Sequence, residues 1–260
     1  MHTARRDRMM NLHKNSGKFE AGGVALDFQK ETIVMGILNI TPDSFSDGGK
    51  FNEIETAVAR AKQMVADGAK IIDIGGESTR PGYTRISDDE EIARVVPVIQ
   101  AIRAEVNTVI SIDTYKSTVA KAAVLAGAHV INDIWGAKRN PEIAKVAADH
   151  GVPIILMHNR DNEEYADFWS EAKQDLEESI QITKAAGVPD EHIWLDPGIG
   201  FAKSTTQNIW MIQHLSDLVE MGYPVLLATS RKRLIGNVLN LPVDERMEGT
   251  GATVCYGVQV

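Results

Sequence analysis

The chain has 260 residues, which allows one or two domains, and its 43% hydrophobic and 24% charged residues exclude a disordered chain. Its 27 basic residues against 36 acidic ones give a formal net charge of −9, which argues against binding to a nucleic-acid backbone or to an anionic membrane surface. The single cysteine, Cys255, excludes an intrachain disulfide and a cysteine-rich zinc module, and without a long apolar run the expected compartment is the reducing cytoplasm.

In chain order, residues 1–17 are basic and lack an apolar segment, so we expect a disordered N-terminal extension. Residues 18–31 alternate around a Gly-Gly pair and predict a β-hairpin beneath the fold. Seven short apolar runs typical of buried parallel strands follow, at residues 33–40, 70–74, 108–112, 129–134, 152–157, 193–195 and 224–228. Between and after them, helical spacing and helix punctuation predict helices at 53–67, from 87, and at 117–126, 141–149, 164–186, 207–221 and 248–258.

Seven strand-then-helix units in a row predict an all-parallel sheet with helical crossovers. Nearly every predicted strand ends in a polar residue, whereas an open doubly wound sheet concentrates its ligand at one switch point. The glycine motifs that bind dinucleotides or nucleotide phosphates are also absent. We therefore predict an α/β fold of the (β/α)8 TIM-type barrel class, with residues 18–260 as a single domain.

Three polar residues at strand ends, Asp113, Asn132 and Asp196, are the best candidates for ligand binding. A carboxylate accepts two parallel N–H groups and an amide both donates and accepts, which suits a neutral heterocycle with a guanidine-like edge. Helix capping competes as an interpretation of each residue singly, but less well for the three together. His129 lies inside an apolar run and is interpreted as structural. His158 lies at a strand end, which is equally consistent with a place in the core and with a place in the ligand site.

A basic sequence, residues 230–233 (SRKR), follows the seventh run, on the side where such barrels bind phosphate. Long polar loops with glycines follow the first and second runs, at residues 41–50 and 76–85. Such loops on a rigid barrel are typical of mobile lids that close over a substrate. We find no nucleophile elbow and no zinc-binding histidine pair.

The motifs resemble those of the dihydropteroate synthase family. They are MGILNITPDSFSDGG (35–49), GGESTRPG (75–82), SIDTYK (111–116), INDIWG (131–136), LMHN (156–159), LDPGIGFAK (195–203) and TSRK (229–232). The resemblance implies a cytoplasmic, homodimeric transferase that joins 6-hydroxymethyl-7,8-dihydropterin pyrophosphate to 4-aminobenzoate in folate biosynthesis and is a target of sulfonamides. Pyrophosphate would leave first and the arylamine would capture the resulting cation, so no protein nucleophile is needed.

The resemblance also implies roles for particular residues. Lys232, Asp113 and Arg80 would be catalytic, and Asn39 would bind a Mg²⁺ carried by the pyrophosphate. The pterin-binding set would be Asp113, Asn132, Ile134, Met157, Asp196, Phe201 and Lys232. The set for pyrophosphate and aminobenzoate would be Thr79, Arg80, Pro81, Ser230 and Lys232. The partners implied are therefore small molecules, with no nucleic acid and no membrane.

One departure concerns the C-terminal part of the barrel. The family has an eighth strand, with an arginine and a histidine that grip the phosphates, and a last helix, and we expect both to be absent from this chain. Arg233 stands where many members have serine. Two alternatives stay open: a methyltetrahydrofolate-type pterin methyltransferase, which would not need the Ser-Arg-Lys sequence, and a non-catalytic pterin-binding relative.

Overall fold

The computed structural model describes residues 17–40, 50–77 and 85–260. The predictions for residues 1–16, for most of the two loops and for Thr79, Arg80 and Pro81 lie outside these ranges. None of the helices in the described ranges is long and apolar enough to cross a membrane.

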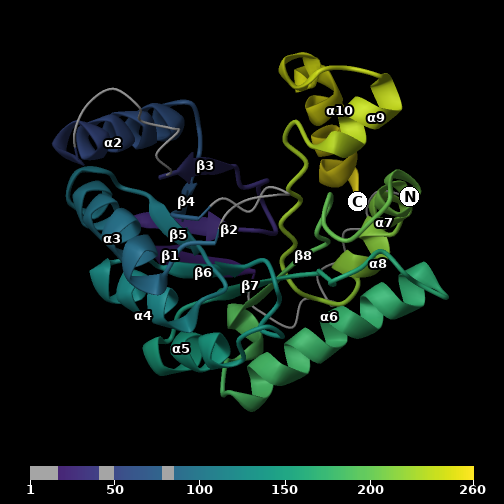
Figure 1. Cartoon of the computed structure of the whole chain (residues 1–260), viewed down its shortest axis with the longest axis horizontal. Coiled ribbons are helices and arrows are strands. Elements are labelled where there is room, and N and C mark those ends of the chain that lie inside the picture. Colours follow the sequence, from purple (N-terminus) through teal and green to yellow (C-terminus); the bar gives the residue numbers. More distant parts are fainter. Residues whose placement is uncertain (1–16, 41–49, 78–84) are drawn as a thin grey trace.

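The centre of the molecule is a parallel sheet of six strands in sequence order, with helices along its outside (Figure 1). The strands are β3 (Met35–Asn39), β4 (Ile71–Gly75), β5 (Val109–Asp113), β6 (Val130–Asp133), β7 (Ile154–Met157) and β8 (Ile193–Asp196). Each lies within, or within one residue of, one of the first six apolar runs. The α/β fold of the TIM-type class is thereby confirmed.

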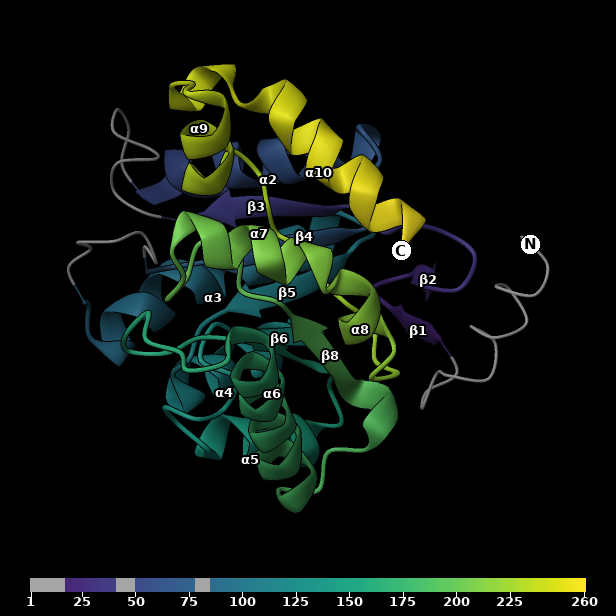
Figure 2. The same cartoon turned by 90° about the vertical axis from the view of Figure 1, so that its right-hand side faces the viewer.

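Both faces of strands β4 to β8 are covered, which explains why their runs are continuously apolar. One set of strand residues, including Ile72, Ile110 and Leu156, packs in the large core with the helices. The alternate residues point to the inside of the curved sheet, where Trp194 and its neighbours meet Leu26. Leu26 belongs to an antiparallel hairpin of β1 (Lys18–Ala21) and β2 (Val24–Asp27), which lies beyond the amino ends of the strands (Figure 2).

The hairpin is fixed to the sheet by aromatic contacts. The ring of Trp194 on β8 lies edge-to-face against Phe19 and Phe28, with centroids 5.7 and 5.1 Å apart. These rings and Leu26 fill the inner space at the amino ends of the strands. The carboxyl ends are therefore the end that is available for a ligand.

The helices follow the predicted order, except that α9 has no counterpart among the predicted helices and that two predicted helices are corrected below. They are α2 (Lys50–Ala66), α3 (Asp88–Glu105), α4 (Ser117–Ala126), α5 (Glu142–His150), α6 (Phe168–Ala185), α7 (Thr205–Gln213), α8 (Leu215–Val219), α9 (Arg233–Leu239) and α10 (Met247–Gln259), with 3-10 turns at Asp190–His192 and Val243–Glu245. Helix α6 begins later than predicted because Asp167 caps it, accepting from the Ser170 N–H. The predicted helix 207–221 begins earlier, at the Ser204 capping box, and is two helices, because the backbone leaves the helical region at His214.

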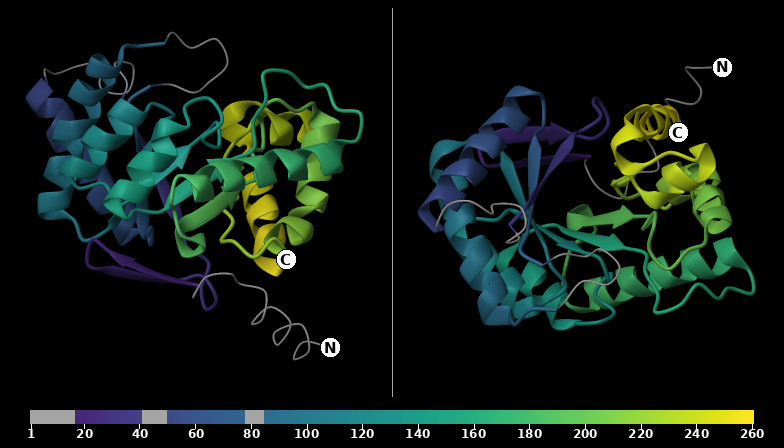
Figure 3. Two further views of the ribbon diagram at one scale, coloured as in Figure 1. Left: turned by 90° about the horizontal axis from the view of Figure 1, so that it is seen from below. Right: turned by 45° about the horizontal axis from the view of Figure 1, so that its top comes forward.

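The prediction of a seventh strand at residues 224–228 was wrong. Only Val225 bridges to Leu195, through the hydrogen bonds Leu195 N to Pro224 O and Leu226 N to Leu195 O, both 2.8 Å long. Pro197 lacks an N–H and directly follows β8, so the ladder cannot continue in that direction. In the described ranges β3 pairs with β4 alone, and Ile37 on β3 is 51% exposed. The curvature of the sheet is visible in Figure 3.

Candidate functional site at the carboxyl ends of the strands

Acidic and amide side chains meet at the carboxyl ends of the strands, as the parallel arrangement requires. The register pairs Gly75 with Asp113 and Asp113 with Asn132, so β4, β5 and β6 end side by side. The Nδ2 of Asn132 donates to Oδ2 of Asp73 at 3.1 Å. The structure thus brings Asp113 and Asn132 together and adds Asp73, which sequence reasoning did not select.

Burial makes these carboxyl groups difficult to ionise. It raises the pKa of Asp113 well above its usual range, and the negative charges of Asp73, Glu91 and Asp133 raise it further, while the charge of Lys232 lowers it. Burial also raises the pKa of Asp73 and of Asp196. Oδ1 of Asp113 is buried without a hydrogen-bond partner among the described residues. A ligand that brings N–H donors or positive charge would satisfy these groups.

Asp196, the last residue of β8, is held by the glycine loop that follows it. Its Oδ1 accepts the N–H of Gly198 at 2.6 Å, which leaves Oδ2 for another donor. Gly198 has a φ of +67°, and a Cβ atom on it would lie 2.0 Å from the carbonyl oxygen of His158. Only glycine can therefore bring this loop so close to the end of β7.

Lys232 supplies the positive charge of the site, immediately before α9. Its Nζ donates to the carbonyl of Ile199 at 2.5 Å and lies 4.9 Å from the ring centroid of Phe201. Burial lowers the pKa of Lys232, while the charges of Asp196 and Asp113 raise it. The prediction that Lys232 and the strand-end carboxylates share one site therefore agrees with the geometry.

A small apolar cluster adjoins the polar groups. Ile134 and Met157 are buried together, and Phe201 packs against them, so the three predicted wall residues are brought together. Tyr115 belongs to the same cluster and was missed from the sequence. Its hydroxyl donates to Glu77 Oε1 at 3.2 Å, which links the apolar wall to a buried charge cluster.

The buried charge cluster consists of Lys116, Glu77 and Glu91, and sequence reasoning did not predict it. Nζ of Lys116 donates to Glu77 at 2.8 Å, to Glu91 at 2.7 Å and to the carbonyl of Ile86 at 2.8 Å. All three protons of the ammonium group are therefore used. The cluster joins the end of β4 to the start of α3, on either side of residues 78–84.

The remaining predicted residues lie at the rim. Asn39 ends β3 and is exposed, and a Cβ atom on Gly75 would lie 3.5 Å from both Asn39 Oδ1 and Asp113 Oδ2, so these two side chains converge. Ser230 is also exposed and lies two residues before Lys232. Thr79, Arg80 and Pro81 fall in the undescribed range.

The two histidines of interest are structural. His129 Nδ1 accepts the N–H of Ile110 at 2.9 Å, and burial lowers its pKa to about 4. His158 is buried, with Nε2 3.1 Å from Asp175 Oδ2, and burial lowers its pKa to about 4. Asp175 also accepts from Arg160 at 2.6 Å, so His158 belongs to a network behind the mouth.

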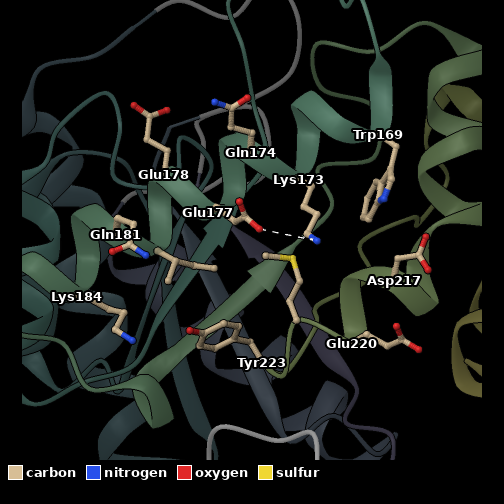
Figure 4. A pocket seen from close by; sticks show the side chains of 12 residues that line it. Trp169, Lys173, Gln174, Glu177, Glu178, Gln181, Lys184, Asp217, Glu220 and Tyr223 are labelled. Atoms are coloured by element: carbon tan, nitrogen blue, oxygen red, sulfur yellow. Dashed lines mark ion pairs between the residues drawn. The ribbon is translucent and has the colours of Figure 1, made fainter.

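A groove elsewhere on the surface is separate from this site. It lies between α6 and α8 and is lined mainly by polar side chains such as Lys173 and Glu177 (Figure 4). None of its lining residues comes from the carboxyl ends of the strands. We therefore take the carboxyl ends of the strands as the candidate ligand site.

Comparisons with known proteins show the family to which the chain belongs. Residues 35–260 match the family model described as pterin binding enzyme. Dihydropteroate synthase of Bacillus subtilis is 58% identical over 235 residues, covering 90% of this chain and 82% of the relative. That of Clostridium beijerinckii is 56% identical over 237 residues, covering 91% and 88%.

Solved structures of similar proteins include dihydropteroate synthases with bound small molecules. The Clostridium difficile enzyme in the presence of pteroic acid has a TM-score of 0.86 at 46% identity, covering 88% of each chain. The Xanthomonas albilineans enzyme with 4-aminobenzoic acid has a TM-score of 0.88 at 40% identity, covering 94% of this chain and 90% of that one. The chain therefore belongs to the pterin-binding enzyme family.

Proposed function

We propose that this protein catalyses the dihydropteroate synthase reaction: 6-hydroxymethyl-7,8-dihydropterin pyrophosphate and 4-aminobenzoate give 7,8-dihydropteroate and pyrophosphate. The observation that carries the proposal is the set of buried carboxyl groups, Asp73, Asp113 and Asp196, beside the Asn132 amide and the Lys232 ammonium. A pterin ring presents parallel N–H donors along one edge and acceptors along another. The donors suit Asp196 and Asp113, while Asn132 and Lys232 can donate to ring acceptors.

The same groups suit the chemistry of the reaction. The bond between the pterin methylene and the pyrophosphate oxygen breaks, the electron pair leaves with pyrophosphate, and positive charge develops on the pterin. Buried carboxylates at Asp113 and Asp196 stabilise such a charge more strongly than water would. The arylamine nitrogen then forms its bond to the methylene and loses a proton, so the protein supplies positioning and electrostatics.

The apolar wall of Ile134, Met157 and Phe201 is suited to the flat face of the ring. The approach of 4-aminobenzoate and the departure of pyrophosphate would be on the side of Ser230 and Lys232. Thr79, Arg80 and Pro81 are assigned to these steps by the sequence resemblance. Arg80 would act catalytically by stabilising the charge of the departing pyrophosphate.

We propose Mg²⁺ as the cofactor, because of the oxygen ligands that this ion prefers. No group of three or more acidic, histidine or cysteine ligands occurs in the described ranges. Mg²⁺ is commonly held by one or two protein oxygens together with substrate phosphates. The exposed amide oxygen of Asn39, which converges on Asp113 Oδ2, fits that pattern. When bound with the pyrophosphate, the ion would neutralise the charge of the leaving group.

We further propose a cytoplasmic homodimer. The exposed Cys255 suits a reducing compartment. Helices α7 and α9 pack together and expose Trp210, Val238 and Leu239, a set of apolar side chains that a second subunit would cover. Light scattering should give twice the chain mass of 28.5 kDa. A particle of 28.5 kDa would contradict the dimer.

A coupled pyrophosphate-release assay tests the function. Release from dihydropterin pyrophosphate should depend on added 4-aminobenzoate, and mass spectrometry should identify 7,8-dihydropteroate. Methyl transfer from methyltetrahydrofolate without pyrophosphate release would favour the methyltransferase alternative. Tight pterin binding without any turnover would favour a non-catalytic relative.

A further inference from the structure

Lys203 is a buried lysine that the proposed reaction does not use. It is 3% exposed, and no carboxylate of the described residues is hydrogen-bonded to it. Its Nζ donates to three backbone carbonyls: Gly198 and Phe201 at 3.0 Å each, and His158 at 3.4 Å. An ammonium group has three donors, so this arrangement uses all of them.

The carbonyls come from two different segments. His158 follows β7, whereas Gly198 and Phe201 belong to residues 197–203, the loop between β8 and α7. This loop has no regular secondary structure, and Gly198, Gly200 and Ala202 all have positive φ. Apart from a turn bond from the Phe201 N–H to the Gly198 carbonyl, the donors to these three carbonyls come from the Lys203 side chain.

Other side chains hold the same loop. Asn208 on α7 accepts the Gly200 N–H at 2.6 Å and donates to the Lys203 carbonyl at 3.0 Å. The Tyr165 hydroxyl donates to the Ala202 carbonyl at 2.9 Å. The loop is therefore held from the inside by Lys203 and from the outside by Asn208.

The loop in turn holds Lys232. The Ile199 carbonyl accepts from Lys232 Nζ, and the Phe201 ring lies beside the same ammonium group. The aliphatic stem of Lys232 also passes the loop, since a Cβ atom on Gly200 would lie 3.4 Å from it. The position of the Lys232 ammonium group thus depends on the conformation of residues 197–203.

We propose that Lys203 is a positioning residue, which clamps residues 197–203 against the end of β7 and thereby fixes the ammonium group of Lys232 in the pterin site. Replacing Lys203 by an apolar side chain would remove the side-chain donor from the buried carbonyls of His158 and Phe201 and leave the Gly198 carbonyl with the Phe201 N–H at 3.1 Å, and the loop would shift to find other donors. Since Lys203 is covered by this loop, it acts through Lys232 without contact with a ligand.

The test is a double-mutant cycle on Lys203→Met and Lys232→Met, with the dissociation constant for 6-hydroxymethylpterin measured by calorimetry. Lys203→Met alone should raise this constant about tenfold. In the Lys232→Met background the same substitution should have a clearly smaller effect, because only the contacts of the loop with Asp196 and with the ring then remain to be disturbed. Lys121→Met, at an exposed position on α4, is the matched control and should stay within about twofold of the parent protein.

Equal effects of Lys203→Met in both backgrounds would overturn the proposal, as would a folded Lys203→Met protein with unchanged affinity. If Lys203→Met does not fold, the same cycle with Asn208→Ala decides, because that variant releases the loop from its other side. A loss of pterin affinity that is smaller in the Lys232→Met background supports the proposal. An equal loss in both backgrounds, or no loss, overturns it. The inference rests on the proposed function only in its use of a pterin as the probe. A parent protein that binds no pterin would refute the proposed function. Pterin binding with additive effects of the two substitutions would refute the role of Lys203 alone.

Discussion

The Asp196→Asn substitution tests the pterin site most selectively, because it changes one atom of the side chain. Oδ1 of Asp196 already accepts the Gly198 N–H at 2.6 Å. An asparagine would keep its carbonyl oxygen on that donor and place its NH2 group at the position of Oδ2. The mouth would then present a donor where the pterin edge also presents donors.

The magnitude follows from this geometry. A hydrogen bond to a charged acceptor contributes about 1.5–3 kcal/mol, and a buried donor left without an acceptor costs about 1–3 kcal/mol. We expect pterin binding to weaken by about 3–5 kcal/mol, so that Kd rises by roughly two to three and a half orders of magnitude. The fold should persist, because burial already raises the pKa of Asp196 and a neutral amide removes that penalty.

Calorimetry with 6-hydroxymethylpterin measures the loss, and thermal unfolding of the same sample shows whether the variant is folded. Asp149→Asn, at an exposed position on α5, is the matched control and should bind like the parent protein. A folded Asp196→Asn protein that binds pterin within about fivefold of the parent would refute the reasoning, since that factor corresponds to only about 1 kcal/mol.

Three further predictions concern the framework of the site. NMR titration should show the His158 imidazole gaining its proton near pH 4, compared with 6.5 for a free side chain. This residue therefore lowers the free energy of unfolding as the pH drops from 6.5 towards 4. A midpoint near 6.5 would show that His158 is not buried as described. Lys116→Met strands the carboxylates of Glu77 and Glu91 and should lower the free energy of unfolding by about 3–5 kcal/mol in urea titrations, whereas a loss below about 1 kcal/mol would mean that the cluster is unimportant for stability. Gly198→Ala places a Cβ atom 2.0 Å from a backbone oxygen and should weaken pterin binding, and unchanged affinity would show that the loop adapts freely.

The fold could be predicted where burial requires a recognisable pattern of apolar residues in the sequence. Strands covered on both faces appear as apolar runs such as residues 70–74, and helices that end at glycines such as Gly127 have clear limits. The strand at 224–228 could not be judged in this way. Its apolar run resembles the others, but its pairing depends on Pro197 in a neighbouring segment, which no local pattern reveals.

The candidate site likewise contains residues that a sequence pattern indicates and residues that only the structure reveals. Asp113, Asn132 and Asp196 stand out because they interrupt apolar runs at strand ends. Asp73 has an apolar residue on either side, and its role becomes visible only through its contact with Asn132. Lys203 donates to backbone carbonyls, whose positions depend on the fold and not on residue type, so no sequence pattern singles it out.

The decisive experiment is a crystal structure of the protein with 6-hydroxymethylpterin pyrophosphate bound. We expect the ring to lie at the carboxyl ends of the strands, with its N–H edge within hydrogen-bonding distance of Asp196 and the ammonium group of Lys232 beside it. A ring bound elsewhere, for example in the groove between α6 and α8, or bound at the carboxyl ends without contact to Asp196, would refute the proposed pterin site.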